Sequence, residues 1–390
     1  MLVKELTLRG LLSFGSKAET LTLQPLNVLI GPNGSGKSNL VEAIGLLRSS
    51  ASKLTAPLRG TGGGGVKEWI WKGADDAIAA IEAVIAYPGK KQSLRHKLEF
   101  SDSQSRFELV DETIENQSPY PSHDHPIFYY QFHRGKPVLT THDGNKRTIK
   151  RENVAPDESI LSQRKDPDQY PELAYLSQMY GRVRLYREWS FGRSSVFRSP
   201  QPADLQTDRL EEDFSNLGLF LNHLRGTPKA KNKIIEHLRD LYEGLEDFDV
   251  RIKGGTVEVF LTEGDFTIPA SRLSDGTLRY LCLLAILCDP HPPALVCIEE
   301  PELGLHPDML PKIADLMIEA SQHTQLIVTT HSDTLVDAMS ERPEAVVVVE
   351  KHNGQTQTKR LEKNAELQEW LKKYRLGQLW TRGEIGGTRW

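Results

Sequence analysis

Hydrophobic and polar residues alternate at the start of the chain, and this pattern predicts strands within residues 2–30. Leu2, Leu6 and Leu8 are interleaved with polar neighbours, and residues 27–30 form a short apolar run typical of a buried strand. Further apolar segments predict successive strands of an antiparallel sheet; they cover residues 78–87, 94–100, 107–110 and 127–132.

Two stretches of different composition predict loops. Residues 112–171 are rich in Pro, Asp, Ser and His, and apart from the strand at 127–132 we expect them to be connections. Residues 60–65 are glycine except for one threonine, which predicts a mobile loop.

The second half of the chain changes to alternating strands and helices. Apolar positions at helical spacing predict helices over residues 39–47, 209–224, 229–245, 277–287 and 307–320. Buried strands are predicted at 294–298 and 325–329, and a hairpin around His352-Asn-Gly joins 346–350 to 357–361. Strands that alternate with helices favour a parallel sheet covered by helices. Prolines and the lack of heptads between residues 39 and 272 exclude a long coiled-coil arm.

Composition describes an ordinary globular protein. The 390 residues are 38% hydrophobic and 26% charged, enough for one large or two modest domains. The net charge of −5 provides no global attraction to nucleic acid, although a local basic face remains compatible with it. Cys282, Cys288 and Cys297 lie in apolar stretches and are expected to be buried, reduced thiols.

Membrane insertion and export are not expected. The longest apolar run, residues 281–288, is far shorter than the roughly 20 residues that span a bilayer. The N-terminus lacks the apolar core of a signal peptide. We therefore expect a cytoplasmic protein with no membrane partner.

A phosphate-binding loop is the strongest chemical signal. Gly31-Pro-Asn-Gly-Ser-Gly-Lys-Ser38 matches GxxxxGK[ST] and lies between a predicted strand and a predicted helix. Glycines allow consecutive backbone N–H groups to surround phosphate oxygens at a helix N-terminus. Lys37 can then reach the β- and γ-phosphates, and the Ser38 hydroxyl can bind Mg²⁺.

Two carboxylates follow the strand Ala294-Leu-Val-Cys-Ile-Glu-Glu300. Ligands of open α/β sheets bind at the carboxyl ends of the strands, where Glu299 and Glu300 would lie. Glu299 is expected to help hold Mg²⁺, and Glu300 to orient and deprotonate the attacking water. A pair of acids that only caps the next turn is the alternative.

Two further segments suit a γ-phosphate. Leu273-Ser-Asp-Gly-Thr277 opens a predicted helix, so Ser274 and Gly276 can present a hydroxyl and a bare N–H at its N-terminus. A simple N-cap is the structural alternative. His331, in Thr329-Thr-His-Ser332, follows a buried strand and has either a phosphate contact or a structural role.

In their order these four segments resemble ABC-type ATPases of the SMC, RecF and Overcoming-Lysogenization-Defect group. There they are the Walker A loop, the signature, the Walker B strand and the switch histidine. The resemblance covers residues 1–50 and 250–350, includes Ser13-Phe14, and is greatest to short bacterial ATPases with Glu299-Glu-Pro-Glu-Leu-Gly-Leu-His-Pro307. Relatives act in phage defence or DNA repair.

The resemblance implies an α/β fold: an ABC-type P-loop NTPase head with an antiparallel β lobe, a parallel-sheet core and a helical insertion. We expect one head over residues 1–390, with the nucleotide-binding core at 1–110 and 249–390. The insertion would cover 111–248, with its helical part at 205–246.

The resemblance also implies a homodimer that hydrolyses ATP with Mg²⁺, in which Ser274 touches ATP held by Lys37 of the partner chain. The ATP contacts are expected from Asn33, Gly34, Ser35, Gly36, Lys37, Ser38, Asn39, Ser274, Asp275 and Gly276. The catalytic residues would be Glu300, Lys37 and His331, and the Mg²⁺ ligands Ser38, Glu299 and a Q-loop glutamine. Gln163 is the preferred glutamine, with Gln131 and Gln178 as alternatives.

Two positions depart from the family pattern. Glu299 stands where the Walker B strand usually has aspartate, and its longer side chain places the usual magnesium geometry in question. Asp275 stands where the signature has glycine, so its carboxylate must point away from the phosphate.

Two segments outside the motifs attract attention. Arginines and aromatic residues alternate over residues 182–198, which suits either nucleic-acid contact or a packed, solvated face; the arginines are Arg182, Arg184, Arg187, Arg193 and Arg198. Residues 376–390 contain tryptophan beside glycine and form either a docking tail or a segment folded back on the head.

Four functions compete. An ATP-driven switch that signals to DNA or to an effector on a separate chain leads. A self-contained TOPRIM nuclease is disfavoured because only about 60 residues follow His331, short of a typical domain. A transporter subunit would have a signature closer to Leu-Ser-Gly-Gly-Gln. An ATP-binding sensor with little hydrolysis remains open because of Glu299.

Overall fold

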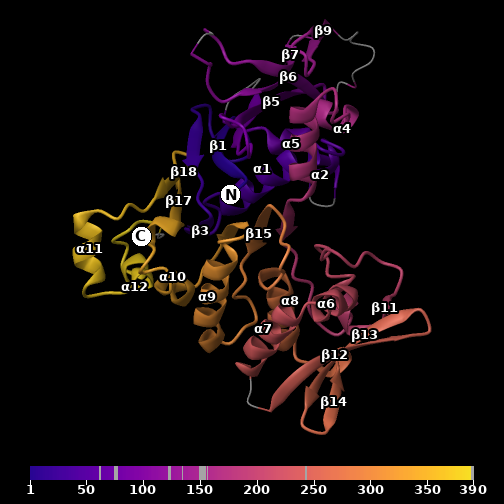
Figure 1. Ribbon diagram of the computed structural model, residues 1–390. Coiled ribbons are helices and arrows are strands. Elements are labelled where there is room, and N and C mark those ends of the chain that lie inside the picture. The colour runs from indigo at the N-terminus through magenta and orange to yellow at the C-terminus, as the bar shows by residue number, and fades with distance from the viewer. Residues whose placement is uncertain are drawn as a thin grey trace. The chain divides into compact units, whose positions relative to one another are not determined.

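The computed structural model describes residues 1–387 except 61–62, 74–77, 122–123, 134, 149–154, 156 and 242–243. The chain forms two compact units (Figure 1). The first unit comprises Met1–Val183, Glu344–Lys363 and Gly383–Trp390, and the second comprises Arg184–Pro343 and Asn364–Arg382. Part of the predicted glycine loop, residues 61–62, lies outside the described residues.

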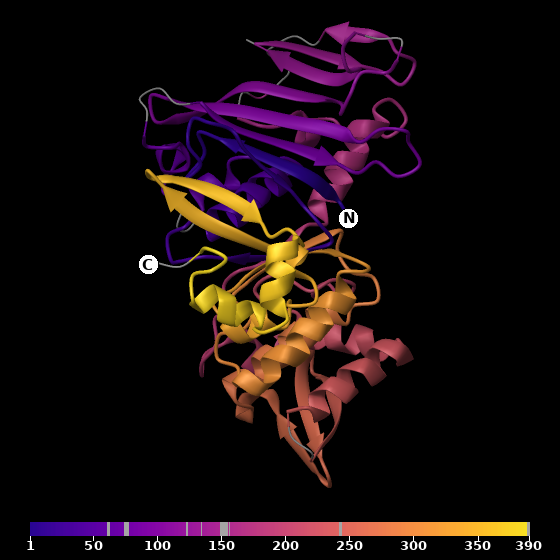
Figure 2. The same ribbon diagram turned by 90° about the vertical axis from the view of Figure 1, so that its left-hand side faces the viewer.

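An antiparallel sheet dominates the first unit, as the alternation of apolar positions predicts. Its eight strands run in the order β2-β1-β4-β5-β6-β7-β8-β9. Figure 2 shows its long strands β5 and β6 side by side. The strands are β1 (Val3–Arg9), β2 (Glu19–Thr22), β4 (Ala79–Ile85), β5 (Leu94–Ser103), β6 (Arg106–Asn116), β7 (Phe128–His133), β8 (Lys136–Thr140) and β9 (Lys146–Thr148). The short helices α2 (Ala56–Arg59) and α3 (Val66–Trp69) belong to the same unit.

A second group of strands in this unit includes the strand that leads into the phosphate-binding loop. Strand β3 (Leu26–Ile30) is buried at every position and pairs in parallel with β17 (Val346–His352). Strand β17 turns into β18 (Gln355–Arg360) at Asn353 and Gly354, whose φ angles of 50° and 78° suit a tight hairpin turn. The predicted hairpin is confirmed. Helix α1 (Lys37–Ser49) follows β3 and packs against α5 (Pro171–Gly181).

The prediction that residues 112–171 are mainly connections is confirmed in part: turns and irregular segments separate the elements here, but the sheet extends further than predicted. Strand β6 continues to Asn116, β8 and β9 extend the sheet, and α4 (Ile160–Gln163) and α5 follow. Polar residues form strands here because neighbouring strands supply the hydrogen-bond ladder, and this supply is not visible in local composition.

A buried polar network joins this sheet to α4. Glu112 of β6 and His96 of β5 are fully buried, and their side chains lie 3.3 Å apart. The Glu112 carboxylate also accepts hydrogen bonds from the Ser159 hydroxyl and, at 2.9 Å, from the Ile160 N–H at the start of α4. Tyr180 OH, 3.1 Å from His96 Nδ1, extends the network to α5. A buried carboxylate is tolerated because every neighbour provides a hydrogen bond.

The second unit contains the predicted parallel strands. Strand β15 (Leu295–Glu299) lies between β10 (Arg184–Tyr186) and β16 (Gln325–Thr329), and both pairings are parallel. Helices α8 (Asp275–Leu287) and α9 (Leu310–Ala320) pack against each other. All three cysteines of this unit are buried and outside any disulfide, as expected.

A smaller antiparallel sheet completes the second unit. Strand β13 (Thr256–Glu263) pairs with β11 (Gln201–Pro202), β12 (Leu245–Lys253) and β14 (Phe266–Pro269). Helices α6 (Leu217–Arg225) and α7 (Pro228–Arg239) pack on β12. Both helices are shorter than predicted: residues 209–216 form turns, and residue 245 already belongs to β12.

Helix α12 (Leu376–Thr381) is the packed part of the C-terminal segment. Helices α10 (Asp333–Asp337), α11 (Ala365–Leu371) and α12 belong to the second unit. Trp380 is only 8% exposed, and Asp337 accepts hydrogen bonds from the N–H groups of Gly377 and Gln378. These contacts support the folded-back alternative for α12, whereas residues 388–390 lie outside the described residues. Every described helix is too short or too polar to cross a bilayer.

Replacement of Glu112 by alanine tests the buried network. The change leaves the His96 ring, the Ser159 hydroxyl and the Ile160 N–H short of a buried partner, and we expect the free energy of unfolding to fall by about 2–4 kcal/mol. Denaturant unfolding measures this fall. Glu108, exposed on the same strand, is the matched control: Glu108→Ala should change stability by no more than about 0.5 kcal/mol. Equal losses in the two variants would contradict the assigned role.

Candidate nucleotide site

The phosphate-binding loop lies in the first unit between β3 and α1. Gly31, Gly34 and Gly36 have φ angles of 149°, 77° and 112°, in the region that L side chains rarely adopt. A Cβ atom on Gly36 would lie 2.2 Å from Thr356 Oγ1, so glycine is required there for space as well as for conformation. The predicted strand–turn–helix context of the motif is therefore present.

Lys37 is the first residue of α1 and is 6% exposed. Its ammonium group donates hydrogen bonds to the carbonyl oxygens of Gly31, at 2.7 Å, and Pro32, at 3.1 Å. The side chain thus folds back over its own loop, where a phosphate can replace these carbonyls as its partner. Asn33, Gly34 and Ser38 are exposed on this loop, while Ser35 and Gly36 are buried.

Thr356 of β18 forms hydrogen bonds with the loop and with Ser13. Nothing in the local sequence indicated this role. Thr356 Oγ1 lies 2.7 Å from the Ser35 carbonyl oxygen and 2.6 Å from Ser13 Oγ. Ser13 also accepts a hydrogen bond of 2.6 Å from the Asn39 side chain. Three segments far apart in sequence therefore fix the backbone of the loop, and Ser13 gains a structural reason for its place in the motif.

The paired carboxylates lie in the second unit, at the end of β15. Glu299 pairs in register with Thr329 of β16, and the Glu300 N–H donates to the Thr329 carbonyl oxygen at 2.9 Å. Glu300 has a φ of 47°, which is costly for a residue with a side chain. The conformation is held from both sides, because Arg279 of α8 donates to the Glu300 carbonyl oxygen at 3.0 Å.

His331 lies beside Glu300 because β15 and β16 end together. His331 Nε2 is 3.7 Å from Glu300 Oε1, and both side chains are partly exposed. Glu302 holds the histidine backbone: its Oε1 accepts from the His331 N–H at 2.7 Å and from Thr330 Oγ1 at 2.8 Å. Burial raises the pKa of Glu302 above its usual value, against the opposing effect of these hydrogen bonds. The structure therefore brings Glu299, Glu300 and His331 together.

The signature residues begin α8. Ser274 is the N-cap, and its Oγ accepts a hydrogen bond of 3.0 Å from the Thr277 N–H. Ser274 and Asp275 are exposed, and Gly276 has no room for a larger residue without a shift, since a Cβ there would lie 3.0 Å from the Gly304 carbonyl oxygen. The capping role and a phosphate-binding role are compatible, because the helix N-terminus is exposed in this unit.

A family model matches most of the chain. The family described as "AAA domain, putative AbiEii toxin, Type IV TA system" matches residues 26–337. The chain belongs to this family.

Solved structures show the fold of this AAA domain. The crystal structure of an Smc head bound to the C-terminal winged-helix domain of ScpA has a TM-score of 0.60 at 15% identity, over 93% of this chain and 98% of that one. An Smc head from Pyrococcus furiosus with an extended coiled coil, bound to the C-terminal domain of ScpA, has a TM-score of 0.57 at 13% identity, over 95% and 99%. No curated protein matches by sequence. The expected ABC-type P-loop ATPase fold and the SMC-like resemblance are confirmed.

The three glutamines considered for the Q-loop of this AAA domain lie on different elements. Gln163 ends α4, where its side-chain amide accepts from the Ala155 N–H at 3.2 Å and donates to the Glu158 and Ser159 carbonyl oxygens at 3.3 Å each. Gln131 is exposed on β7, and Gln178 is exposed on α5. Gln163 would have to exchange these local bonds for a metal contact.

Each unit of the AAA domain carries an oxygen ligand of the kind that Mg²⁺ uses with ATP. Among the described residues, no cluster of His, Cys, Asp or Glu is arranged to hold a metal ion alone. Mg²⁺ in nucleotide sites uses one or two protein oxygens and completes its shell with phosphates and water. Ser38 supplies an exposed hydroxyl, and the Glu299 carboxylate, 15% exposed, supplies a charged oxygen. Arg187 Nε lies 3.4 Å from Glu299 Oε1 and balances that charge.

The segment rich in arginine and aromatic residues is largely packed. Stacked or tilted rings lie 5.1–6.1 Å apart in the pairs Trp189–Phe191, Trp189–Phe214, Phe191–Phe197 and Tyr186–Phe214. Arg279 stacks on Trp189 at 4.4 Å, and burial lowers its pKa to about 10. Arg184 is buried, while Arg182 and Arg193 are exposed. These contacts favour the packed alternative for the rings and leave Arg182 and Arg193 as the accessible cations for a nucleic acid.

A Thr356→Val variant tests the support of the phosphate-binding loop. Valine has the same shape but cannot hydrogen-bond to Ser35 and Ser13, so we expect ATP affinity to fall by roughly 2–10-fold. Titration with a fluorescent ATP analogue measures the change. Thr358 of the same strand is the control: its hydroxyl bonds to Glu19 at 2.6 Å, away from the loop, and Thr358→Val should leave ATP affinity unchanged. Unaltered affinity in Thr356→Val would show that the loop needs no such support.

Proposed function

We propose that this AAA domain is a dimeric ATP-driven switch that binds and slowly hydrolyses ATP. The phosphate-binding loop of the first unit would hold the triphosphate through Lys37 and its backbone N–H groups, and Ser38 and Glu299 would hold Mg²⁺. Mg²⁺ would supply charge neutralisation at the phosphates. Asn33, Gly34, Ser35, Gly36 and Asn39 would complete the loop contacts.

The position of Glu300 beside His331 is the observation that supports hydrolysis. A carboxylate 3.7 Å from an imidazole, both partly exposed at the carboxyl ends of parallel strands, suits a base that takes a proton from water and a histidine that contacts the γ-phosphate. The strained backbone of Glu300, held by Thr329 and Arg279, is typical of a residue positioned for chemistry.

The signature residues would complete the site of a second copy. Ser274, Asp275 and Gly276 begin α8, and the exposed N-terminus of a 13-residue helix suits the terminal phosphate of ATP held by the partner protomer. ATP would then be clamped between two heads, and its hydrolysis would release them.

The description of the family supports a proposal for the processes that the switch serves. Its description refers to a toxin of a type IV toxin–antitoxin system, and the Smc heads of similar fold were crystallised with ScpA. We propose a role in bacterial phage defence or DNA-related processes in the cytoplasm, with an effector protein on a separate chain or with DNA as the partner.

A sensor that binds ATP with little hydrolysis is the second candidate. The ion pair between Arg187 and Glu299 favours it, because Mg²⁺ must compete with a guanidinium for that carboxylate. Glutamate in place of aspartate also weighs against hydrolysis, because its longer side chain changes the position of the carboxylate relative to Mg²⁺. Both candidates require ATP binding and differ in phosphate release.

Glu300→Gln separates the two candidates. Glutamine cannot accept a proton, so we expect phosphate release to fall by about 100-fold or more while ATP binding and dimerisation persist. Phosphate release, nucleotide titration and sedimentation measure the three properties. Glu366→Gln, an exposed change in α11, should leave all three unchanged. Equal and clearly measurable release rates in wild type and Glu300→Gln would refute the assigned base, whereas wild-type release near zero would support the sensor.

DNA as a partner has a separate test. Charge reversal at the exposed arginines, Arg182→Glu with Arg193→Glu, should weaken DNA binding at least about tenfold at low salt, since each removes a phosphate contact and adds repulsion. Fluorescence anisotropy with a short duplex measures it. A wild-type protein that binds no DNA at low salt excludes DNA, and the effector protein then remains as the partner.

A further inference from the structure

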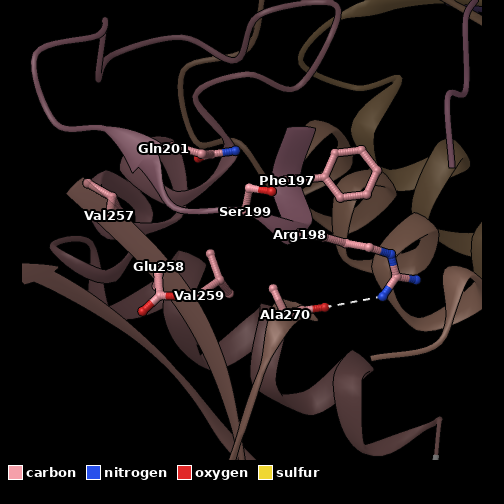
Figure 3. Close-up of a pocket in the computed structure, with 8 residues that line it drawn as sticks. All are labelled: Phe197, Arg198, Ser199, Gln201, Val257, Glu258, Val259 and Ala270. Atoms are coloured by element: carbon pink, nitrogen blue, oxygen red, sulfur yellow. Dashed lines mark hydrogen bonds between the residues drawn. The ribbon is translucent and has the colours of Figure 1, made fainter. Parts of the chain in front are cut away.

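Arg198 makes several contacts with the turn that leads into the signature helix. It lies in the 3-10 turn Val196–Arg198, and its Nη1 donates to the Leu273 carbonyl oxygen at 2.6 Å. The same nitrogen lies 3.4 Å from the carbonyl oxygens of Ala270 and Ser271, and Figure 3 shows the side chain extended toward Ala270. Arg198 Nη2 donates to the Asp275 carboxylate. One guanidinium therefore contacts residues on both sides of Ser274.

The arginine is itself held in place. Its side chain is only 11% exposed, and the neighbouring Phe197 ring packs 5.1 Å from Phe191 and 6.2 Å from Phe214. The same segment makes a second bond to the signature, since the Gly192 N–H donates to Asp275 Oδ1 at 3.2 Å. A planar guanidinium with several fixed contacts loses little conformational freedom for each hydrogen bond that it makes.

The bond between Arg198 and the Asp275 carboxylate affects the charge at the start of α8. The residue lies in the first turn of α8 with its side chain 52% exposed, directly beside the hydroxyl and N–H groups that suit a phosphate. The hydrogen bond from Arg198 lowers the pKa of Asp275, so this group stays ionised at neutral pH. A free carboxylate at this position would repel a phosphate, and the bond to Arg198 both turns it aside and balances its charge.

We propose that Arg198 is a positioning residue for the signature: it fixes the turn before Ser274 and neutralises Asp275, so that the N-terminus of α8 accepts the terminal phosphate of ATP on a second copy of the chain. The proposal rests on the proposed function, since it requires the ATP-clamped dimer. It also explains how an acidic residue is tolerated in the signature.

The test uses the full-length Glu300→Gln protein, in which ATP is trapped. Adding Arg198→Ala should weaken ATP-dependent dimerisation by about 10–100-fold in sedimentation experiments, the range expected for a charged hydrogen bond. ATP binding by the phosphate-binding loop of the monomer should change less than about twofold. Arg209→Ala, a change at an exposed arginine of the same unit that has no contact with the signature, is the control and should dimerise as its parent does.

A second change distinguishes positioning from general stability. In the Arg198→Ala background, Asp275→Gly removes the carboxylate left without its partner, and dimerisation should recover several-fold. A role confined to folding predicts no recovery, because Asp275 is largely exposed. Absence of recovery would overturn the charge-balancing part of the proposal.

The remaining outcomes separate the two levels of the proposal. If the Glu300→Gln parent dimerises with ATP and Arg198→Ala dimerises equally well, the role of Arg198 is refuted while the proposed function stands. If the parent binds ATP without dimerising, the proposed function fails, and this inference fails with it. Should Arg198→Ala lose cooperative thermal unfolding, Arg198→Lys replaces it. Lysine keeps the charge but lacks the two separate nitrogens that bond the Leu273 carbonyl oxygen and Asp275, and unchanged dimerisation would refute the role of Arg198 in fixing the turn.

Discussion

The parallel pairing of β15 with β16 is the constraint on which the chemistry of the second unit depends. Its register places Glu299 opposite Thr329, so the chain leaves both strands at the same level, and Glu300 and His331 emerge side by side. A shift by one residue would direct the side chains to opposite faces and separate them. The left-handed backbone of Glu300 persists because Thr329 holds its N–H and Arg279 holds its carbonyl group.

The packed segment around residues 187–198 serves both chemical regions of this unit. Trp189 donates its ring N–H to the Glu299 carbonyl oxygen at 2.7 Å, and Gly192 and Arg198 bind Asp275 of the signature. Arg279 of α8 stacks on Trp189 and also holds Glu300. Aromatic stacking makes this segment rigid, and its arginines donate hydrogen bonds to carbonyl groups and carboxylates of the same unit. The segment therefore connects the end of β15 with the beginning of α8.

Three acidic groups near the end of β15 and the start of α8 have local partners. Arg187 pairs with Glu299, Arg198 pairs with Asp275, and the Glu302 carboxylate accepts from the His331 N–H and the Thr330 hydroxyl. Nucleotide and Mg²⁺ would have to exchange for some of these partners. Binding would thus replace existing ion pairs, and the net gain depends on how well the new contacts satisfy the released groups.

Local sequence determined the elements whose chemistry is local. The glycines at positive φ, the lysine at the start of α1, the acids at the end of a buried strand and the capping serine of α8 are all recognisable, because each depends on a few consecutive residues. The extension of the antiparallel sheet through β8 and β9 was missed, since its polar strands depend on neighbours for their hydrogen bonds.

Tertiary structure alone decided which distant residues support these elements. Thr356 reaches the carbonyl of Ser35 from 321 positions away, and Arg198 reaches Asp275 from 77 positions away. The burial of Glu112 with His96 and Ser159 likewise joins three separate elements. A hydrogen bond between side chains of distant segments leaves no periodic or local trace in a single sequence, because its geometry exists only after the sheets and helices have packed.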